Sequence, residues 1–489
     1  ESKPAVTTDP VAVNERKKGK METENGGLSS ARPELIETQN DEKGQSDEGT
    51  VVKVEVGKVD HKDTMFKTVL NIMFLGLGTS ALAIVKVPFD ISIIMTVVCI
   101  VIGGICNIWS YRILGDLYEK YKIVDYERLT EKIHGKGIKI LLFVTLNIYT
   151  CGLLLIHQVL CYRLLGGIVN TIGGYDYDSM LDFLDKEFWS KIWCKAAVNF
   201  GLAILVIFPL CLIKDMKKLN ISSLVGVFTT VFILLIVLVQ FPGYVIHYLD
   251  VYPNWTEVVN FYDVKEGFTK RIYFVQHLAL FFFCFTGHNG LLPALEHLEN
   301  PTQERRNFLY NASIGCDMII YVIISLTGYL SSPKEGLEIV FERKRIWGKD
   351  IVMTIGRIAL IPMAISKIQV NHNIWRISYF STVGEGQENL SLKGNLIFTG
   401  ITLLITTTLA SVYQNVVGYI SLIGCFCVVI PAFLIPALLY VKDNGRGYTE
   451  CKNLVNLTIG SLLCIIGYFS GVLSVIDLVD PPPPKFTDV

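Results

Sequence analysis

Eleven apolar segments joined by mostly short loops constrain this chain more than any other feature. Several exceed the roughly 20 apolar residues that a helix needs to cross the hydrocarbon of a bilayer. Charged residues make up 18% of the chain, whereas soluble globular proteins carry about 25%. We therefore predict an all-α integral membrane protein embedded in the lipid bilayer. The predicted spans are 65–88, 90–115, 138–168, 193–214, 220–247, 268–297, 306–331, 350–378, 394–413, 415–441 and 453–478.

Composition argues against several other classes of protein. A net charge of −1 gives no sign of a nucleic-acid partner. The 12 cysteines lie mostly inside predicted spans, where a free thiol behaves as a small hydrophobe, and their spacing predicts no metal site and no disulfide framework. The sequence shows no nucleotide-binding motif and no nucleophile constellation. We therefore expect a protein that is not an enzyme and that holds no cofactor.

Three regions follow from composition. Residues 1–62 are rich in Lys, Glu, Asp, Ser, Thr and Gly and contain no aromatic residue, which predicts a disordered cytosolic tail. Residues 63–480 form the predicted transmembrane domain, and residues 481–489 form a short Pro-rich tail. The N-terminal region has no apolar core of the kind that a secretory signal needs.

Basic residues mark one side of the predicted membrane domain. The segments 112–139 and 214–218 and the pair Arg305-Arg306 are basic, whereas the loop 176–187 is acidic. Because Lys and Arg concentrate on the cytoplasmic side, this pattern predicts a cytosolic N-terminus. The loop 334–349 disagrees, since it is basic and yet falls on the outer side.

The same orientation places the sequon Asn254-Trp255-Thr256 in an outer loop, so we predict a glycan on Asn254. A plasma membrane and a lysosomal or vacuolar membrane both fit the sequence. The sequence defines no oligomeric state.

Two apolar segments are interrupted by small and polar residues. The sixth segment reads Thr286-Gly287-His288-Asn289-Gly290 in its middle, and the first reads Gly76-Leu77-Gly78-Thr79-Ser80. Lipid cannot satisfy the backbone groups that such a break frees, so the breaks must lie inside the protein or line a cavity. In transporters, broken helices usually mark the binding site. The pair therefore predicts a carrier.

Four motifs occur in the order found in a known family. Residues 78–83 are similar to the glycine signature of its first helix, with Ser80 in place of the second Gly. Residues 209–223 are similar to the exit of its fourth helix, and residues 288–301 are similar to the His…Leu-Pro pattern of its sixth helix. Gly328-Tyr329 is similar to the end of its seventh helix. Residues 65–478 thus resemble the amino acid/auxin permease family, especially its sodium-coupled neutral amino acid transporters. The resemblance implies a LeuT-like fold with two inverted five-helix repeats, alternating access and an amino acid substrate.

The breaks indicate where a substrate would bind. An unwound helix presents free N–H groups to a carboxylate at the start of its second half. Close helix packing is the alternative role for the glycines, and core packing or bracing is the alternative for the phenylalanines and histidines. The predicted substrate-binding residues are Gly76, Gly78, Thr79, Ser80, Ala81, Leu82, His157, Phe283, Phe285, Thr286, Gly287 and His288.

The chain departs from the sodium-coupled branch at positions that concern the coupling ion. Phe74 stands where that branch has Asn, and Lys367 occupies the middle of the eighth segment, which normally supplies hydroxyls. The ammonium of Lys367 could replace a sodium ion; snorkelling to the interface is the alternative. Transported H⁺, transported Na⁺ and exchange all stay open. The predicted coupling and gating residues are Asn71, Glu296, Ser366, Lys367 and Asn371, with Glu296 closing an inner gate against a basic residue such as Lys217.

Two other functions fit the same sequence. A transporter-like amino acid sensor would signal through a cytosolic partner of the tail 1–62, and a structural membrane subunit would have lost transport. Retained substrate binding would argue against the structural subunit.

Overall fold

The structure is a computed structural model. It describes residues 63–77, 79–173, 189–213, 216–252, 254, 258–261, 267–334, 336–344, 346, 351–383, 391–445 and 450–479. The predicted tails 1–62 and 481–489 lie outside these residues, so the domain boundaries stay predictions.

The predicted all-α membrane fold is confirmed. Among the described residues, ten helices are long and apolar enough to cross a membrane, and the number is eleven if Met65–Gly76 and Ser80–Ile91, which meet at a bend of 56°, form one span. In the described part of the chain, extended pairing is limited to one bridge between Asp63 and Leu298.

Most spans are long helices, and the two broken spans consist of shorter helical pieces. The broken first span consists of α1 (Met65–Gly76), α2 (Thr79–Ala83), η1 (Ile84–Lys86) and α3 (Val87–Ile91). The broken sixth span consists of α12 (Gly267–Cys284) and α13 (His288–His297). The other elements are α4 (Ile93–Tyr121), α5 (Tyr126–His134), α6 (Lys136–Ile172), α8 (Ile192–Leu202), η2 (Ala203–Ile207), α9 (Phe208–Cys211), α10 (Met216–Val251), α14 (Gln303–Leu330), η3 (Val340–Glu342), α15 (Ile351–Val383), α16 (Leu392–Val412), α17 (Val416–Ile423), η5 (Gly424–Val428), η6 (Ile430–Leu434), α18 (Ile435–Asn444) and α19 (Cys451–Val479).

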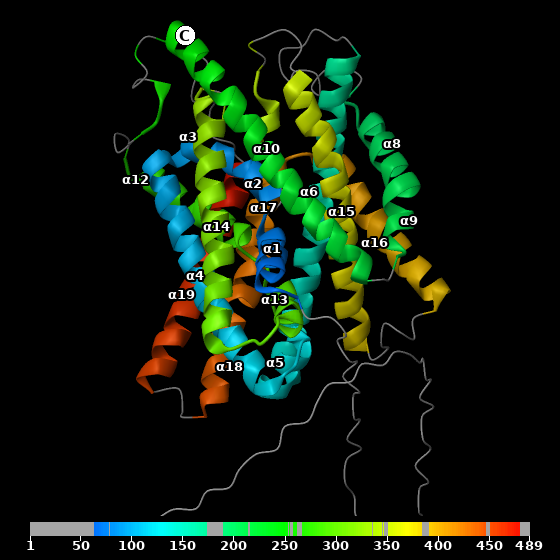
Figure 1. Ribbon diagram of the computed structural model, residues 1–489, viewed down its shortest axis with the longest axis vertical. Helices are drawn as coiled ribbons and strands as arrows, with labels where there is room; N and C mark the ends of the chain where they lie inside the picture. The colour runs from blue at the N-terminus through cyan, green and yellow to red at the C-terminus, as the bar shows by residue number, and fades with distance from the viewer. Residues whose placement is uncertain are drawn as a thin grey trace, which may run out of the picture. The chain divides into compact units, whose positions relative to one another are not determined.

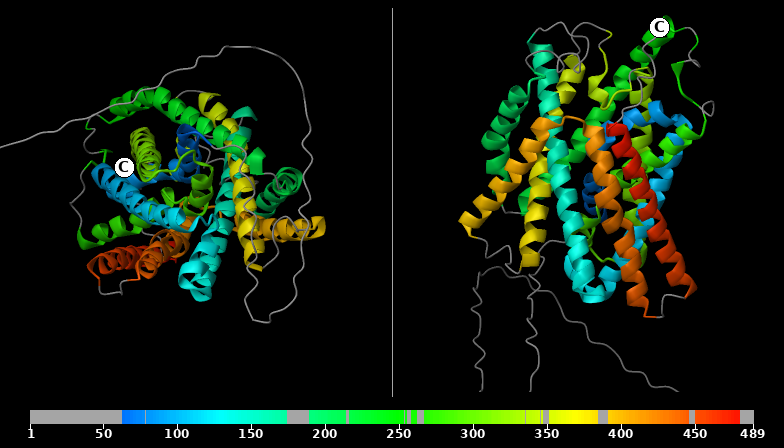
Figure 2. Two further views of the ribbon diagram at one scale, coloured as in Figure 1. Left: turned by 60° about the horizontal axis from the view of Figure 1, so that its bottom comes forward. Right: turned by 180° about the vertical axis from the view of Figure 1, so that it is seen from behind.

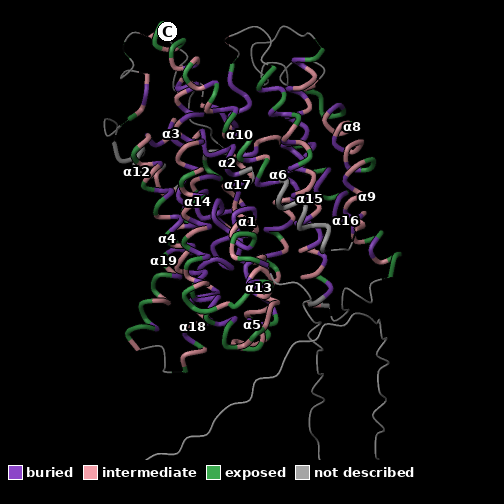
Figure 3. Tube along the Cα trace, viewed as in Figure 1, coloured by how far each residue is buried: buried purple, intermediate pink, exposed green. Residues whose placement is uncertain are grey.

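The two broken spans occupy the centre of the helix bundle (Figure 1). Of the 18-residue apolar window in the span His277–His297, 78% is buried, whereas in Ile192–Cys211 the share is 28%. Figure 3 shows the same pattern, with buried residues gathered around α1, α2 and α17 and exposed residues along the outer helices. The irregular backbone therefore lies inside protein, as an environment without water requires.

Long helices enclose this centre. α6 packs along α15, and α14 packs against both α4 and α1. α18 and α19 lie side by side at the back of the bundle (Figure 2). The breaks are thus surrounded by α4, α6, α14 and α15.

The two broken spans are joined at one end. The backbone N–H of Asp63 donates to the carbonyl of His297 at 2.6 Å, and the N–H of Glu299 donates to the carbonyl of Asp63 at 3.1 Å. The start of α1 and the end of α13 are therefore held together.

Candidate functional site

The break after α1 frees the carbonyl of Gly76, which accepts a hydrogen bond from Ser80 and lies close to the hydroxyl of Tyr321. α1 ends at Gly76, and Leu77 follows in an extended conformation. Ser80 Oγ donates to the Gly76 carbonyl at 3.2 Å, and Tyr321 OH from α14 lies 3.0 Å from the same oxygen. Position 76 leaves little room for a side chain, because a Cβ there would lie 3.0 Å from Asp317 Oδ2 and 3.2 Å from the Cys284 carbonyl.

Three tyrosines from three different helices donate hydrogen bonds to the carbonyl groups at the break between α12 and α13. Tyr321 of α14 donates to the carbonyl of Cys284 at 2.8 Å, Tyr111 of α4 to that of Phe285 at 3.2 Å, and Tyr149 of α6 to that of Thr286 at 3.4 Å. A buried carbonyl without a partner costs about 1–3 kcal/mol. The tyrosines therefore stabilise three consecutive peptide groups that a continuous helix would have paired internally.

Lys367 reaches the α1 break from the middle of α15. Its ammonium donates to the carbonyl of Phe74 and lies 3.6 Å from the centre of the Phe74 ring. Gly226 on α10 makes room for that ring, since a Cβ there would lie 1.8 Å from it. Lys367 is buried, so its charge lies inside the bundle and does not extend to an interface.

A cavity lies between the two breaks, α6 and α15. Seven of the predicted site residues line it, namely Gly76, Ser80, His157, Phe283, Thr286, Lys367 and Asn371. The other lining residues are Phe74, Leu75, Leu77, Tyr149, Leu153, Asn289 and Val370. The cavity thus combines one cation and several uncharged polar groups with an apolar wall.

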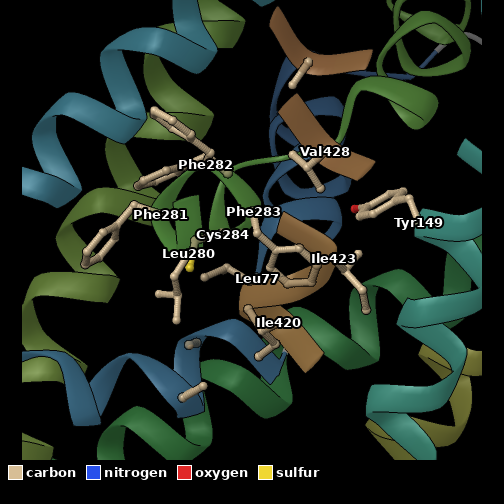
Figure 4. Packing of buried hydrophobic residues seen from close by; sticks show 14 of the residues in the cluster. Leu77, Tyr149, Leu280, Phe281, Phe282, Phe283, Cys284, Ile420, Ile423 and Val428 are labelled. Atoms are coloured by element: carbon tan, nitrogen blue, oxygen red, sulfur yellow. The ribbon is translucent and has the colours of Figure 1, made fainter. Parts of the chain in front are cut away.

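Tyr149 and Phe283 form part of that wall. The two rings meet edge to face with centroids 6.0 Å apart (Figure 4). Gly152, one turn further along α6, allows Ile423 of α17 to pack closely, because a Cβ there would lie 2.1 Å from the end of the Ile423 side chain. α6, α12 and α17 are therefore packed tightly on this side.

His157 lines the cavity and has one ring nitrogen without a hydrogen-bond partner among the described residues. Its Nδ1 lies 2.7 Å from the Leu153 carbonyl, which accepts only, so Nδ1 carries the proton in the neutral ring. Nε2 has no partner among the described residues and is left as an acceptor. This nitrogen can accept a hydrogen bond from a substrate.

The remaining predicted residues lie elsewhere. Phe285 packs edge to face on Tyr321, with ring centroids 5.1 Å apart. His288 Nε2 lies 2.9 Å from Ser110 Oγ on α4, which is the bracing alternative. Gly287 packs against Leu75 and Tyr111. Ala81 and Leu82 are buried in the core, Asn71, Glu296 and Ser366 are half-buried off the cavity, and Gly78 and the side chains of Thr79 and Lys217 lie outside the described residues.

The sequence reasoning missed Asp317 and the tyrosines. Asp317 and Tyr321 are one turn apart on α14 and face the breaks. A signal for Asp317 was available, because an acidic residue within an apolar span is rarely without function. Tyr111 and Tyr149 gave no such signal, since tyrosine is common in helix cores.

Two broken helices that meet at a central cavity, within a bundle of apolar spans, define a membrane carrier. The sequence profile of the family described as "Transmembrane amino acid transporter protein" matches residues 61–479. The chain therefore belongs to this family, which confirms the predicted class and means that it is a transporter and not an enzyme.

Curated relatives are similar at low identity. "Vacuolar amino acid transporter 7" of Saccharomyces cerevisiae is 27% identical over 168 residues, which are 33% of this chain and 31% of that protein. "Putative sodium-coupled neutral amino acid transporter 11" of Homo sapiens is 22% identical over 356 residues, which are 72% of this chain and 81% of that protein. The match thus spans about a third of the yeast protein and most of the human one.

A solved structure confirms the LeuT-like fold. The crystal structure of MhsT in complex with L-phenylalanine superposes with a TM-score of 0.54 at 15% sequence identity, over 85% of this chain and 98% of that one. At this identity the likeness concerns the fold.

Proposed function

We propose that this chain carries neutral amino acids across a membrane by alternating access, with Lys367 in the place of a coupling sodium ion. The observation that carries the proposal is the contact of the buried Lys367 ammonium with the Phe74 carbonyl at the α1 break. A sodium ion needs several oxygen ligands at one point, and here an ammonium already occupies the carbonyl that the break frees.

The cavity has groups for both ends of an amino acid. Lys367 has three donors, and those that Phe74 does not use can bind the substrate carboxylate. His157 Nε2 and the Thr286 carbonyl can accept from the substrate ammonium. Leu153, Phe283 and Val370 form an apolar wall for the side chain, which favours a neutral substrate.

Uptake into proteoliposomes tests the proposal. Purified protein would be reconstituted and supplied with radiolabelled neutral L-amino acids under an inward sodium gradient, an inward proton gradient, or neither. We expect uptake without sodium, with stimulation by protons or by amino acid inside the vesicles. Strict dependence on sodium would overturn the role of Lys367, and absence of uptake and of binding would overturn the transport proposal.

The orientation proposed for the chain has the α5 end in the cytosol. Arg343 contributed to the one loop that disagreed, but it is buried, bonds to Gln240 and stacks on Tyr244 at 3.8 Å. Lys334 stacks on Tyr252, also at 3.8 Å. These cations hold the loop against α10 and its end, so their presence reflects packing more than topology. Asn254 is exposed beyond the end of α10, where we propose a glycan.

The membrane itself is proposed as plasma, lysosomal or vacuolar. One relative is named as a vacuolar transporter and another as a sodium-coupled transporter. Microscopy of the tagged chain in its own cell type would decide between these membranes.

A further inference from the structure

Asp317 is a buried carboxylate to which the proposed function gives no role. It lies in α14 with 1% of its surface exposed, and neither carboxylate oxygen has a hydrogen-bond partner among the described residues. An ionised carboxylate taken out of water costs several kcal/mol unless charge or hydrogen bonds compensate it. Ionisable groups within a membrane usually belong to an ion or proton pathway.

The carboxylate faces the α1 break. A Cβ on Gly76 would lie 3.0 Å from Asp317 Oδ2, and Gly76 itself lines the cavity, whereas Asp317 does not. Gly76 is therefore a neighbour of both Asp317 and the substrate cavity. A substrate can act on Asp317 through charge without touching it.

The charged and titratable groups around Asp317 come from several helices. They are Tyr111 of α4, Cys284 of α12, Cys316 and Tyr321 of α14 itself, and Lys367 of α15. Among these groups Lys367 is the cation, and its charge opposes the effect of burial on the Asp317 carboxyl. The charge state of Asp317 therefore depends in part on a lysine that lines the cavity.

We propose that Asp317 is the proton-binding site of the transport cycle, and that it binds one proton when a substrate carboxylate engages Lys367. This inference rests on the proposed function, because it needs an amino acid in the cavity. In the empty carrier the ammonium of Lys367 compensates the carboxylate of Asp317. A substrate carboxylate takes over that ammonium, and Asp317 then binds a proton from the side to which the cavity is open.

The proton leaves when the substrate leaves. Once the cavity opens to the other side and the amino acid dissociates, Lys367 again compensates Asp317, and the carboxyl releases its proton there. Lys367 keeps its own protons throughout. One amino acid and one proton thus move in the same direction, and the amino acid gradient is linked to the proton gradient.

Proton uptake by the unmodified protein is the first test. A neutral L-amino acid mixture would be added to the detergent-solubilised full chain in weak buffer with a pH indicator, while binding is followed by the shift in Tm. We expect about one proton taken up per amino acid bound. Binding without proton uptake would overturn the inference and leave the proposed function intact, whereas failure of binding and of exchange would overturn the proposed function itself.

The second test compares Asp317→Asn with Asp116→Asn, which makes the same change at an exposed site on α4, where the side chain is 64% exposed. We expect Asp317→Asn to exchange internal for external amino acid within about twofold of the unmodified chain and to lose about tenfold or more of proton-driven accumulation. Asp116→Asn should retain both activities, and Asp317→Glu should retain coupling.

Two results of this test would overturn the inference. One is proton-driven accumulation that survives in Asp317→Asn. The other is accumulation driven by sodium alone and lost in Asp317→Asn, which would make the carboxylate a sodium ligand. If Asp317→Asn does not fold, the proton uptake of the unmodified chain and the behaviour of Asp317→Glu decide the question.

Discussion

The two breaks at the centre of the protein are held in different ways. Between α12 and α13, three consecutive carbonyls accept hydrogen bonds from neutral tyrosines that belong to three helices. At the end of α1, the Phe74 carbonyl accepts from the charged Lys367, and Asp317 lies beyond Gly76. The α12–α13 break depends on packing and hydroxyl groups, and the α1 break depends on charge in addition to the hydroxyl groups near the Gly76 carbonyl.

This difference indicates which break responds to substrate. A neutral hydroxyl that donates to a carbonyl carries no charge that an ion or a proton in the cavity would change. A buried ammonium changes its interactions when an anion or a proton binds nearby, because charges interact strongly in a medium of low dielectric constant. We therefore expect the α12–α13 break to act as a fixed wall and the α1 break to move during transport.

The largest effect should come from Lys367→Met, which keeps most of the length of the side chain and removes its charge. The Phe74 carbonyl loses its donor and Asp317 loses its compensating cation, so we expect amino acid binding and uptake to fall by about 100-fold or more. Binding and uptake in proteoliposomes would be measured beside thermal unfolding in detergent.

The double variant Lys367→Met/Asp317→Asn separates charge from packing. Because it removes both charges, it should recover thermal stability lost in Lys367→Met without recovering proton coupling. A double variant no more stable than Lys367→Met would show that the two charges do not interact, and the contrast between the breaks would then fail.

Glu127→Gln tests whether a titrating carboxyl affects the stability of the protein where α5 contacts α15, the helix that carries Lys367. Glu127 of α5 accepts a hydrogen bond from Ser378 near the end of α15. Burial, with a contribution from the charge of Asp125, raises the pKa of Glu127 to about 7. The folded protein therefore holds an extra proton between the unfolded-state pKa, near 4.5, and about 7, so its stability falls as the pH rises through this window.

The variant should flatten that dependence. A shift of this size corresponds to at most about 3 kcal/mol between pH 5 and pH 8, and Glu127→Gln should remove most of it. Thermal unfolding across this pH range would measure the effect, with Glu131→Gln on the same helix as a control that keeps the slope. An unchanged slope in Glu127→Gln would assign the pH dependence to another group.

The spans, both breaks and the charge at Lys367 could be predicted from the sequence. Hydropathy and the glycine and polar interruptions define the spans and breaks locally, and a lysine nine residues from Arg376 lies deep in its span wherever the helix ends fall. The cavity-lining set was predicted only in part. His288 and Phe285 face neighbouring helices because the rotation of α13 and α12 about the break depends on tertiary packing.

Asp317 and the tyrosines depend on that packing even more. Whether Tyr321 faces lipid, core or break is decided by the rotation of α14 against α1 and α4, and apolar periodicity does not fix this rotation. The carbonyls that the tyrosines satisfy do not exist as free acceptors until the chain bends. A single sequence therefore shows that a break needs donors without showing which residues supply them.

The smallest effects should come from the tyrosines, and their order tests the description of a fixed wall. Tyr321→Phe removes the donor to the Cys284 carbonyl, the shortest of the three bonds at 2.8 Å, and should cost about 1–3 kcal/mol. Tyr111→Phe and Tyr149→Phe each affect one carbonyl, with bonds of 3.2 and 3.4 Å, so we expect progressively smaller losses. Thermal unfolding would give the order, and none of the three should change the pH dependence of uptake. If Tyr149→Phe alone abolished substrate binding, its hydroxyl would be a substrate ligand, and the α12–α13 break would belong to the moving part of the site.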